Sequence, residues 1–97
     1  MNQLSSADIA SRLATLNSQS TVAWRLADNG LEKTWVFPDF AAAFAFMTRV
    51  AAEAELMNHH PDWRNVWNKV EVRLSTHDAG GITGLDFRLA AAMDRLA

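Results

Sequence analysis

The fold is decided by residues 55–86, which read ELMNHHPDWRNVWNKVEVRLSTHDAGGITGLD. Apolar residues alternate with polar ones over residues 70–75, which is the two-residue period of a half-buried strand. Pro61 cannot continue a helix and pushes His60 toward extended geometry, so the helix before it must end there. A short strand over residues 63–67 and a tight turn at Asn68-Lys69 then complete a hairpin with the alternating strand.

A second hairpin is predicted on the N-terminal side of this stretch. Alternation over residues 22–27 predicts one strand. Asp28-Asn29-Gly30 follows as a turn, because these residues tolerate the positive φ angles of tight turns. Residues 31–37 form the partner strand, with Lys33 interrupting its apolar face. The apolar positions are Val22, Trp24 and Leu26 in the first strand and Leu31, Trp35 and Phe37 in the second.

Helical spacing of apolar residues predicts three helices around these hairpins. Ser5 or Ser6 caps the first helix, and Thr83 caps the last, with Asp86 three residues on as a capping-box variant. The longest helix runs from Asp39 to Met57. The expected buried stripes are Ile9, Leu13 and Leu16 in the first helix; Phe40, Phe44, Met47, Val50 or Ala51, and Ala54 in the longest; and Leu85, Leu89, Met93 and Leu96 in the last.

The predicted order is α-β-β-α-β-β-α within a single domain, residues 1–97. Two hairpins with helices imply an α+β fold, a four-stranded antiparallel sheet with its helices packed on one face. The other face of the sheet, which carries residues such as Glu71 and Arg73, is then open to solvent or to a partner.

Composition narrows the class of protein. The chain has 97 residues, of which 49% are hydrophobic, and a formal net charge of −2. This balance gives no basic face for a phosphate backbone, so direct nucleic-acid binding is not expected. The absence of cysteine excludes disulfides and thiolate metal sites. No apolar run has the length of a signal core or a membrane span, and the sequence therefore predicts a soluble cytoplasmic protein with no membrane contact.

All three histidines of the chain lie within residues 55–86, together with carboxylates at Glu55 and Asp86. Three interpretations remain open from the residues alone. Imidazole and carboxylate groups bind metals, but no local pair with chelating spacing is present. Each histidine can also be a helix terminator or a satisfied polar group. The third interpretation is acid–base catalysis, since imidazole titrates near neutral pH, and this is favoured because no nucleophile is evident.

The spacing of these residues is similar to that of a known family. Glu55-x-x-x-His59-His60-Pro61, followed by Trp67, His77 and Asp86, resembles the signature of the pterin-4a-carbinolamine dehydratases. Residues 43–51, 65–70 and 74–77 also resemble that family, and the likeness covers nearly the whole chain. One difference is Asn58, which stands where an acidic residue is common among members.

The resemblance implies a lyase that needs no cofactor or metal and dehydrates 4a-hydroxytetrahydrobiopterin, or a related pterin, to the quinonoid dihydropterin. This reaction would recycle the pterin of aromatic amino-acid hydroxylases. By likeness, His59 and His77 transfer protons to the leaving hydroxyl and His60 holds the pterin, while Glu55 and Asp86 orient imidazoles. The implied substrate-binding residues are Asn58, His59, His60, Pro61, Ser75, Thr76, His77 and Asp78.

The same resemblance implies a homodimer or homotetramer. It also leaves a non-catalytic alternative, in which the chain is a dimerisation partner of a transcription factor or a regulator of the hydroxylase. The sequence does not separate these roles, although a pure interaction module has no chemical need for three histidines.

Overall fold

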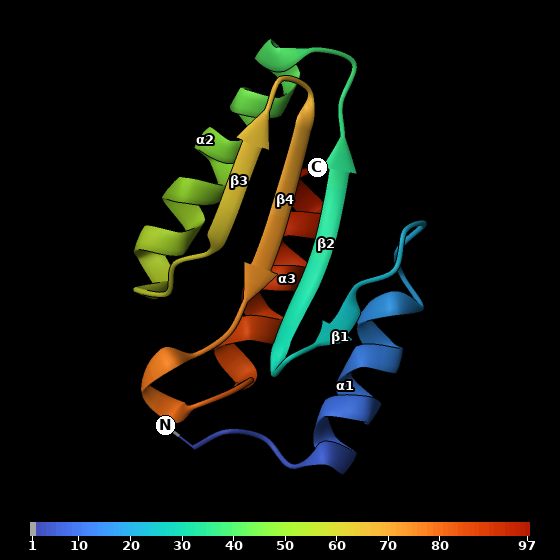
Figure 1. The fold of residues 1–97 in the computed structure, drawn as a ribbon, viewed down its shortest axis with the longest axis vertical. Coiled ribbons are helices and arrows are strands. Elements are labelled where there is room, and N and C mark those ends of the chain that lie inside the picture. Colours follow the sequence, from blue (N-terminus) through green and yellow to red (C-terminus); the bar gives the residue numbers. More distant parts are fainter. Residues whose placement is uncertain (1) are drawn as a thin grey trace.

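The computed structural model describes residues 2–97. In this part of the chain, three α-helices and four strands follow one another in the predicted α-β-β-α-β-β-α order, with one 3-10 helix added (Figure 1). The elements are α1 (Ser6–Asn17), β1 (Arg25–Ala27), β2 (Gly30–Val36), α2 (Phe40–Met57), β3 (Asp62–Val66), β4 (Lys69–Leu74), the 3-10 helix η1 (His77–Ala79) and α3 (Gly84–Leu96).

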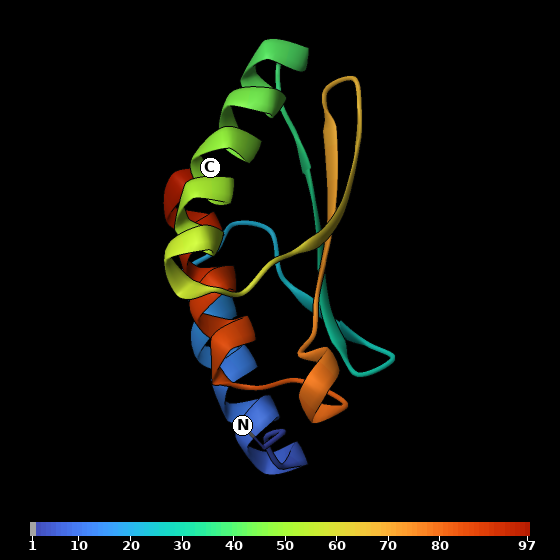
Figure 2. The ribbon, with the colours of Figure 1, turned by 90° about the vertical axis from the view of Figure 1, so that its left-hand side faces the viewer.

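The four strands form one antiparallel sheet in the order β1-β2-β4-β3. Figure 2 shows the sheet edge-on, with the three α-helices on one side of it and the other face uncovered. The predicted α+β class and its one-sided helical layer are therefore confirmed. Because β2 and β4 are the central strands, their alternating residues supply the apolar floor on which the helices pack.

The buried face of helix α2 matches the predicted stripe only in its C-terminal half, where Val50 and Ala54 are buried as expected. Its buried residues are Ala43, Phe46, Val50 and Ala54. Phe40 and Phe44, which were expected to be buried, are 47% and 53% exposed. The alanine side of the helix approaches the sheet closely, and Phe46 fills the space with its ring centroid 5.0 Å from that of Trp35. Both helix faces satisfy the 3.6-residue period, so spacing alone could not choose between them.

The first predicted strand is much shorter than expected. Only Arg25–Ala27 pair with β2, while Val22 and Leu26 are exposed and Trp24 is buried before the strand begins. The side chain of Asn17 explains the early break. It accepts from the Trp24 backbone N–H at 2.8 Å and donates to its carbonyl at 3.1 Å, so this backbone needs no strand partner.

Lys33, which interrupts the apolar face of β2, is buried all the same. Its ammonium donates to Asp94 Oδ1 at 2.8 Å and lies 4.8 Å from the centre of the Trp35 ring. Asp94 in turn accepts from Ser20 and from the indole of Trp24. The charge of Lys33 is therefore compensated within the core rather than carried to the surface.

Two positions in the second hairpin differ from expectation. The turn between β3 and β4 is centred on Trp67 and Asn68, and Trp67 adopts a positive φ of 49°. Trp67 therefore lies in the turn rather than in the predicted strand and is 60% exposed, whereas Trp63 is partly buried and packs against the core. The predicted burial of Val70, Val72 and Leu74 along β4 is confirmed.

Candidate active site

The C-terminal end of α2 sets the position of the first two histidines. Asn58 adopts the left-handed conformation with φ 51° and ψ 44°. Its N–H donates to the Glu55 carbonyl and the His59 N–H to the Ala54 carbonyl, each at 3.1 Å. This is the Schellman pattern of helix termination, in which a left-handed residue reverses the chain direction. The turn directs His59 inward, where it is 9% exposed, and leaves His60 at the surface.

His59 forms the buried centre of the site with Asp86. Its Nε2 lies 2.6 Å from Asp86 Oδ1, although 27 residues separate the two in the sequence. Asp86 is 0% exposed, and its other oxygen accepts from the Thr76 hydroxyl at 2.8 Å and from the Thr83 N–H at 2.9 Å. The donors to this carboxylate, His59, Thr76 and Thr83, therefore come from three different segments of the chain.

Asp86 also begins α3. Thr83 is the N-cap, and its side chain together with the carboxylate of Asp86 forms a complete capping box. The predicted cap is confirmed, and the same carboxylate binds an imidazole. The cap expected from the local pattern and the imidazole contact implied by the family resemblance are thus both made by one side chain.

His60 and Glu55 form a second, exposed pair beside the first. His60 Nε2 lies 2.6 Å from Glu55 Oε1, and both side chains are more than half exposed. The pair closes over the last turn of α2, so it presents an imidazole to solvent at the same helix end that buries His59.

His77 begins η1, immediately after the segment that supplies Thr76 to the Asp86 carboxylate. His77 and Asp78 are exposed, and neither makes a side-chain hydrogen bond within residues 2–97. Ser75 donates to the Asn29 carbonyl at 3.0 Å, so its hydroxyl is bound to the β1–β2 turn. The Thr76 hydroxyl is likewise occupied by Asp86 and Thr83. The Thr76 backbone is occupied as well, because its N–H donates to Gly81 and its carbonyl accepts from Ala79 and Gly81, whereas Ser75 Oγ can still accept a hydrogen bond.

His59 and Asp86 therefore form a buried pair, while the His60–Glu55 pair and His77 are exposed. Over residues 2–97, no three histidine, aspartate or glutamate side chains are placed to hold a metal ion together. With one imidazole buried against a carboxylate and two others at the surface, the arrangement is suited to moving protons.

The N-terminal segment supports the loop between η1 and α3. This contact was not predicted from the sequence. Leu4 donates from its backbone to the Ile82 carbonyl at 2.8 Å, and the side chain of Gln3 occupies the space where a Cβ at Gly81 would lie. Thr76 and Gly81 form an isolated antiparallel bridge across the same loop. No pattern in the sequence signals a contact between the N-terminal segment and this loop.

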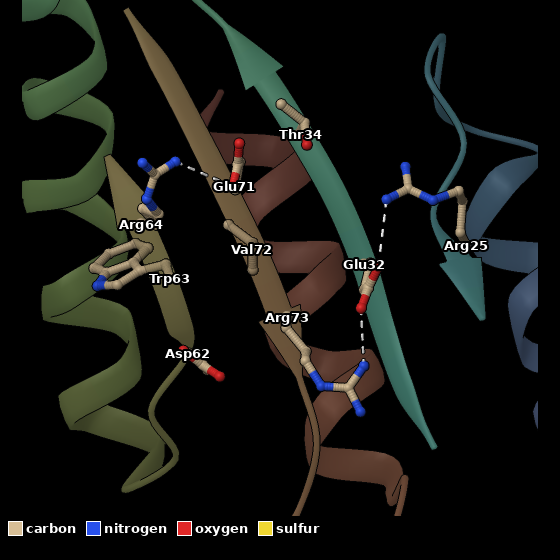
Figure 3. Close-up of a pocket in the computed structure, with 9 residues that line it drawn as sticks. All are labelled: Arg25, Glu32, Thr34, Asp62, Trp63, Arg64, Glu71, Val72 and Arg73. Carbon is tan, nitrogen blue, oxygen red and sulfur yellow. Dashed lines mark hydrogen bonds and ion pairs between the residues drawn. The ribbon is translucent and has the colours of Figure 1, made fainter. Parts of the chain in front are cut away.

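The uncovered face of the sheet contains a hollow of about 400 Å³, which is separate from the histidines (Figure 3). Figure 3 shows charged side chains of both signs across it, and three ion pairs join them. The residues lining the hollow are Arg25, Glu32, Thr34, Asp62, Trp63, Arg64, Glu71, Val72 and Arg73. Since the charges largely neutralise one another, this face lacks the continuous basic potential that binds a phosphate backbone.

Comparison with known proteins identifies the family. The family described as pterin 4 alpha carbinolamine dehydratase matches residues 2–96. The chain belongs to this family. A relative from Rhizobium meliloti (strain 1021), provisionally named as such a dehydratase, is 59% identical over 76 residues, which cover 76% of this chain and 73% of the relative. Another relative, from Rhizobium leguminosarum bv. trifolii (strain WSM2304), has the same provisional name. It is 46% identical over 99 residues, which cover 100% of this chain and 93% of the relative.

Two solved structures share the fold. A protein of Brucella melitensis, described as a transcriptional coactivator/pterin dehydratase, is 35% identical and superposes with a TM-score of 0.90 over 99% of both chains. A pterin dehydratase-like protein, described as a RuBisCO assembly factor in the alpha-carboxysome, has a TM-score of 0.65 at 22% identity and covers 81% of this chain and 92% of its own. The second likeness concerns the fold alone. No helix within residues 2–97 is long and apolar enough to cross a membrane.

Proposed function

We propose that this chain is a lyase that dehydrates a 4a-hydroxytetrahydropterin, such as 4a-hydroxytetrahydrobiopterin, to the quinonoid dihydropterin. In this reaction the C4a–O bond breaks and the oxygen leaves as water after taking up a proton. The lone pair of the adjacent ring nitrogen forms a new C=N bond, and a ring N–H proton is lost. The chemistry needs one proton donor and one acceptor, and imidazole side chains supply both near neutral pH.

The observation that carries the proposal is the buried His59–Asp86 pair beside the exposed His60–Glu55 pair at one helix end. A carboxylate bonded to an imidazole holds the ring in one orientation, which is what directed proton transfer requires. Membership of the dehydratase family supports the same reaction.

Within this proposal, His59 and His77 exchange protons with the substrate, and His60 contacts the pterin ring. Glu55 and Asp86 orient their imidazole partners at 2.6 Å. The pterin would bind against Asn58, Pro61 and the backbone groups of residues 75–78. The Thr76 hydroxyl, N–H and carbonyl are already bound within the protein, so Ser75, His77 and Asp78 would supply these backbone contacts.

The test is an absorbance time course of a 4a-hydroxytetrahydropterin generated in situ by an aromatic amino-acid hydroxylase. The proposal expects the wild-type chain to accelerate formation of the quinonoid product over the spontaneous rate. It expects His77→Ala to lose most of this acceleration while keeping its circular dichroism spectrum and melting temperature. An unchanged spontaneous rate in the presence of folded wild-type protein would exclude the activity.

A second candidate function is binding to a protein partner, beginning with a second copy of this chain. The end of β2, the start of α2 and the β3–β4 turn lie at one end of the molecule (Figure 1). Several large apolar side chains of these segments are exposed. This apolar end consists of Val36, Phe40, Phe44, Val66 and Trp67. Exposed apolar groups gathered at one end favour association, and a homodimer or homotetramer would bury them. Binding to a hydroxylase or a transcription factor would use the same kind of surface.

Light scattering coupled to size-exclusion chromatography tests this second candidate. Phe44→Ser is expected to lower the oligomeric state, because it removes an aromatic ring from the apolar end. Leu56→Ser is the matched control, since Leu56 is 84% exposed on the same helix but at its other end. A wild-type chain that is monomeric at all concentrations, or equal effects of both substitutions, would exclude association through the apolar end.

A further inference from the structure

We propose that Thr76 and Thr83 are positioning residues that fix the tautomer of His59, and that His59 Nδ1 is the nitrogen that exchanges a proton with the substrate. The catalytic half of this inference rests on the proposed dehydratase function. The positioning half rests on hydrogen-bond geometry around Asp86 and is measured independently of activity.

The direction of each hydrogen bond in this network follows from the groups that form it. Asp86 Oδ2 is a carboxylate acceptor, so Thr76 must use its only hydroxyl proton to donate to it at 2.8 Å. The 2.7 Å bond between the two threonine hydroxyls must then be donated by Thr83. Thr83 Oγ1 is free to do so, because it accepts from the Leu85 N–H at 3.3 Å. The chain of donation therefore runs from Thr83 through Thr76 to Asp86.

This order leaves one arrangement for the imidazole. Asp86 Oδ2 already accepts from Thr76 and from the Thr83 N–H, and Oδ1 faces His59 Nε2 at 2.6 Å. A contact of this length to a carboxylate oxygen requires a proton on Nε2. Neutral His59 is therefore the Nε2–H tautomer, and its Nδ1 carries the lone pair.

Nδ1 is also the nitrogen that remains accessible. It has no hydrogen-bond partner within residues 2–97, and no side-chain nitrogen or oxygen there is both fully buried and unpartnered. Since His59 as a whole is 9% exposed, part of that exposure belongs to Nδ1. The ring is held from behind by a buried carboxylate and open at the opposite nitrogen, which is the usual design of an oriented proton-transfer group.

The role of Nδ1 in the reaction follows directly. When His59 is protonated, Nδ1–H gives its proton to the departing 4a-hydroxyl, which leaves as water with the electrons of the C4a–O bond. His59 is left as the Nε2–H tautomer that the network stabilises. The ring N–H proton is accepted by a second base, either His77 or solvent, so protons and electrons balance without any further reactant.

Nitrogen NMR on histidine-labelled protein measures the tautomer directly. The His59 signals are assigned by their loss in His59→Gln, and spectra are recorded over a series of pH values so that those of the neutral ring are identified. We expect a protonated Nε2 and an unprotonated Nδ1 in the wild-type chain. Thr76→Val keeps the side-chain shape but removes one of the two donors that hold Asp86 Oδ2, so the carboxylate can turn away from His59 Nε2. The variant should therefore show a mixture of tautomers and a kcat lowered by at least about tenfold with little change in KM, because Nδ1 is no longer fixed as the nitrogen that exchanges the proton.

The controls separate positioning from a loss of folding. Thr76→Ser and Thr83→Ser retain the hydroxyls and should restore the wild-type tautomer and kcat. Thr48→Val removes an exposed hydroxyl on α2 that donates to the Phe44 carbonyl, and it should leave the tautomer and kcat unchanged.

A wild-type Nδ1–H tautomer, or a folded Thr76→Val variant with the wild-type tautomer and kcat, would overturn the inference. A wild-type chain without dehydratase activity would overturn the proposed function and the catalytic role of Nδ1, and the spectra would still decide whether the threonines orient the ring.

Discussion

His59 Nε2 and Asp86 Oδ1 lie 2.6 Å apart in the interior, and the carboxylate that holds the imidazole also caps α3. The fold and the candidate site therefore depend on one side chain. A helix cap must be rigid to satisfy the first N–H groups of the helix. Because the same carboxylate binds His59, the imidazole is held rigidly as well. A change at Asp86 consequently affects stability and chemistry together.

Asp86→Ala is expected to lower the free energy of unfolding by about 2–5 kcal/mol, because it removes a cap and leaves buried donors on Thr76 and His59 without an acceptor. Asp8→Ala, at an exposed position in the first turn of α1, is the control and should cost about 1 kcal/mol or less. Urea denaturation measures both values. Equal losses in the two variants would contradict the network described around Asp86.

Asn58 tests the turn that separates the buried histidine from the exposed one. Since its φ is 51°, Asn58→Gly should preserve or slightly raise stability, whereas Asn58→Ala should cost about 1 kcal/mol. The comparison by thermal melting isolates backbone conformation, because both variants remove the same amide side chain. A variant pair with the same melting temperature would show that the left-handed turn is not required.

Gly30 and Arg73 form a clamp over the β1–β2 hairpin. A Cβ at Gly30 would lie 2.5 Å from the Arg73 guanidinium, which donates to the Ala27 and Asp28 carbonyls and to Glu32. Gly30→Ala should therefore cost about 1–3 kcal/mol of unfolding free energy in the wild-type background. It should cost clearly less in an Arg73→Ala background, where the space is vacant. Equal costs in both backgrounds, measured by a double-mutant cycle, would show that the two residues do not compete for this space.

The buried ion pair in the core gives a further prediction. Asp94→Ala leaves the Lys33 ammonium without a partner at a position that is 4% exposed, and should cost about 3–5 kcal/mol. Glu71→Ala breaks an exposed pair with Arg64 and should cost about 1 kcal/mol or less. Adding Lys33→Met to Asp94→Ala should recover part of the loss, as chemical denaturation would show. A loss below about 1 kcal/mol for Asp94→Ala would contradict burial of the lysine charge.

The sequence predicted most elements of the fold because their signals are local. Alternation marks β4, and Thr83 with Asp86 marks the start of α3, in each case from residues only a few positions apart. On α2, the burial of Val50 and Ala54 was predicted, but that of Phe40 and Phe44 was not borne out, because phenylalanine and alanine residues occur on both faces of the N-terminal half of the helix. The choice between its faces depends on the volume left above Trp35 by the sheet, which is a property of the assembled core.

The candidate site, like the fold, could be predicted only in part from the sequence. The sequence supplied the histidines and carboxylates and indicated that Asp86 could either cap a helix or orient an imidazole. The pairing of Asp86 with His59 rather than with another histidine depends on how α2 and α3 pack, which no local pattern encodes. The occupation of the Thr76 and Ser75 hydroxyls by protein groups is equally a result of tertiary contacts.

The most direct test is the initial rate of dehydration of a 4a-hydroxytetrahydropterin by His59→Gln, measured beside the wild-type chain at equal concentration of folded protein. Because His59 is proposed to exchange the proton on which C4a–O cleavage depends, the account predicts a fall of at least about 100-fold in the catalysed rate. A folded His59→Gln variant that dehydrates the pterin at the wild-type rate would contradict the central claim.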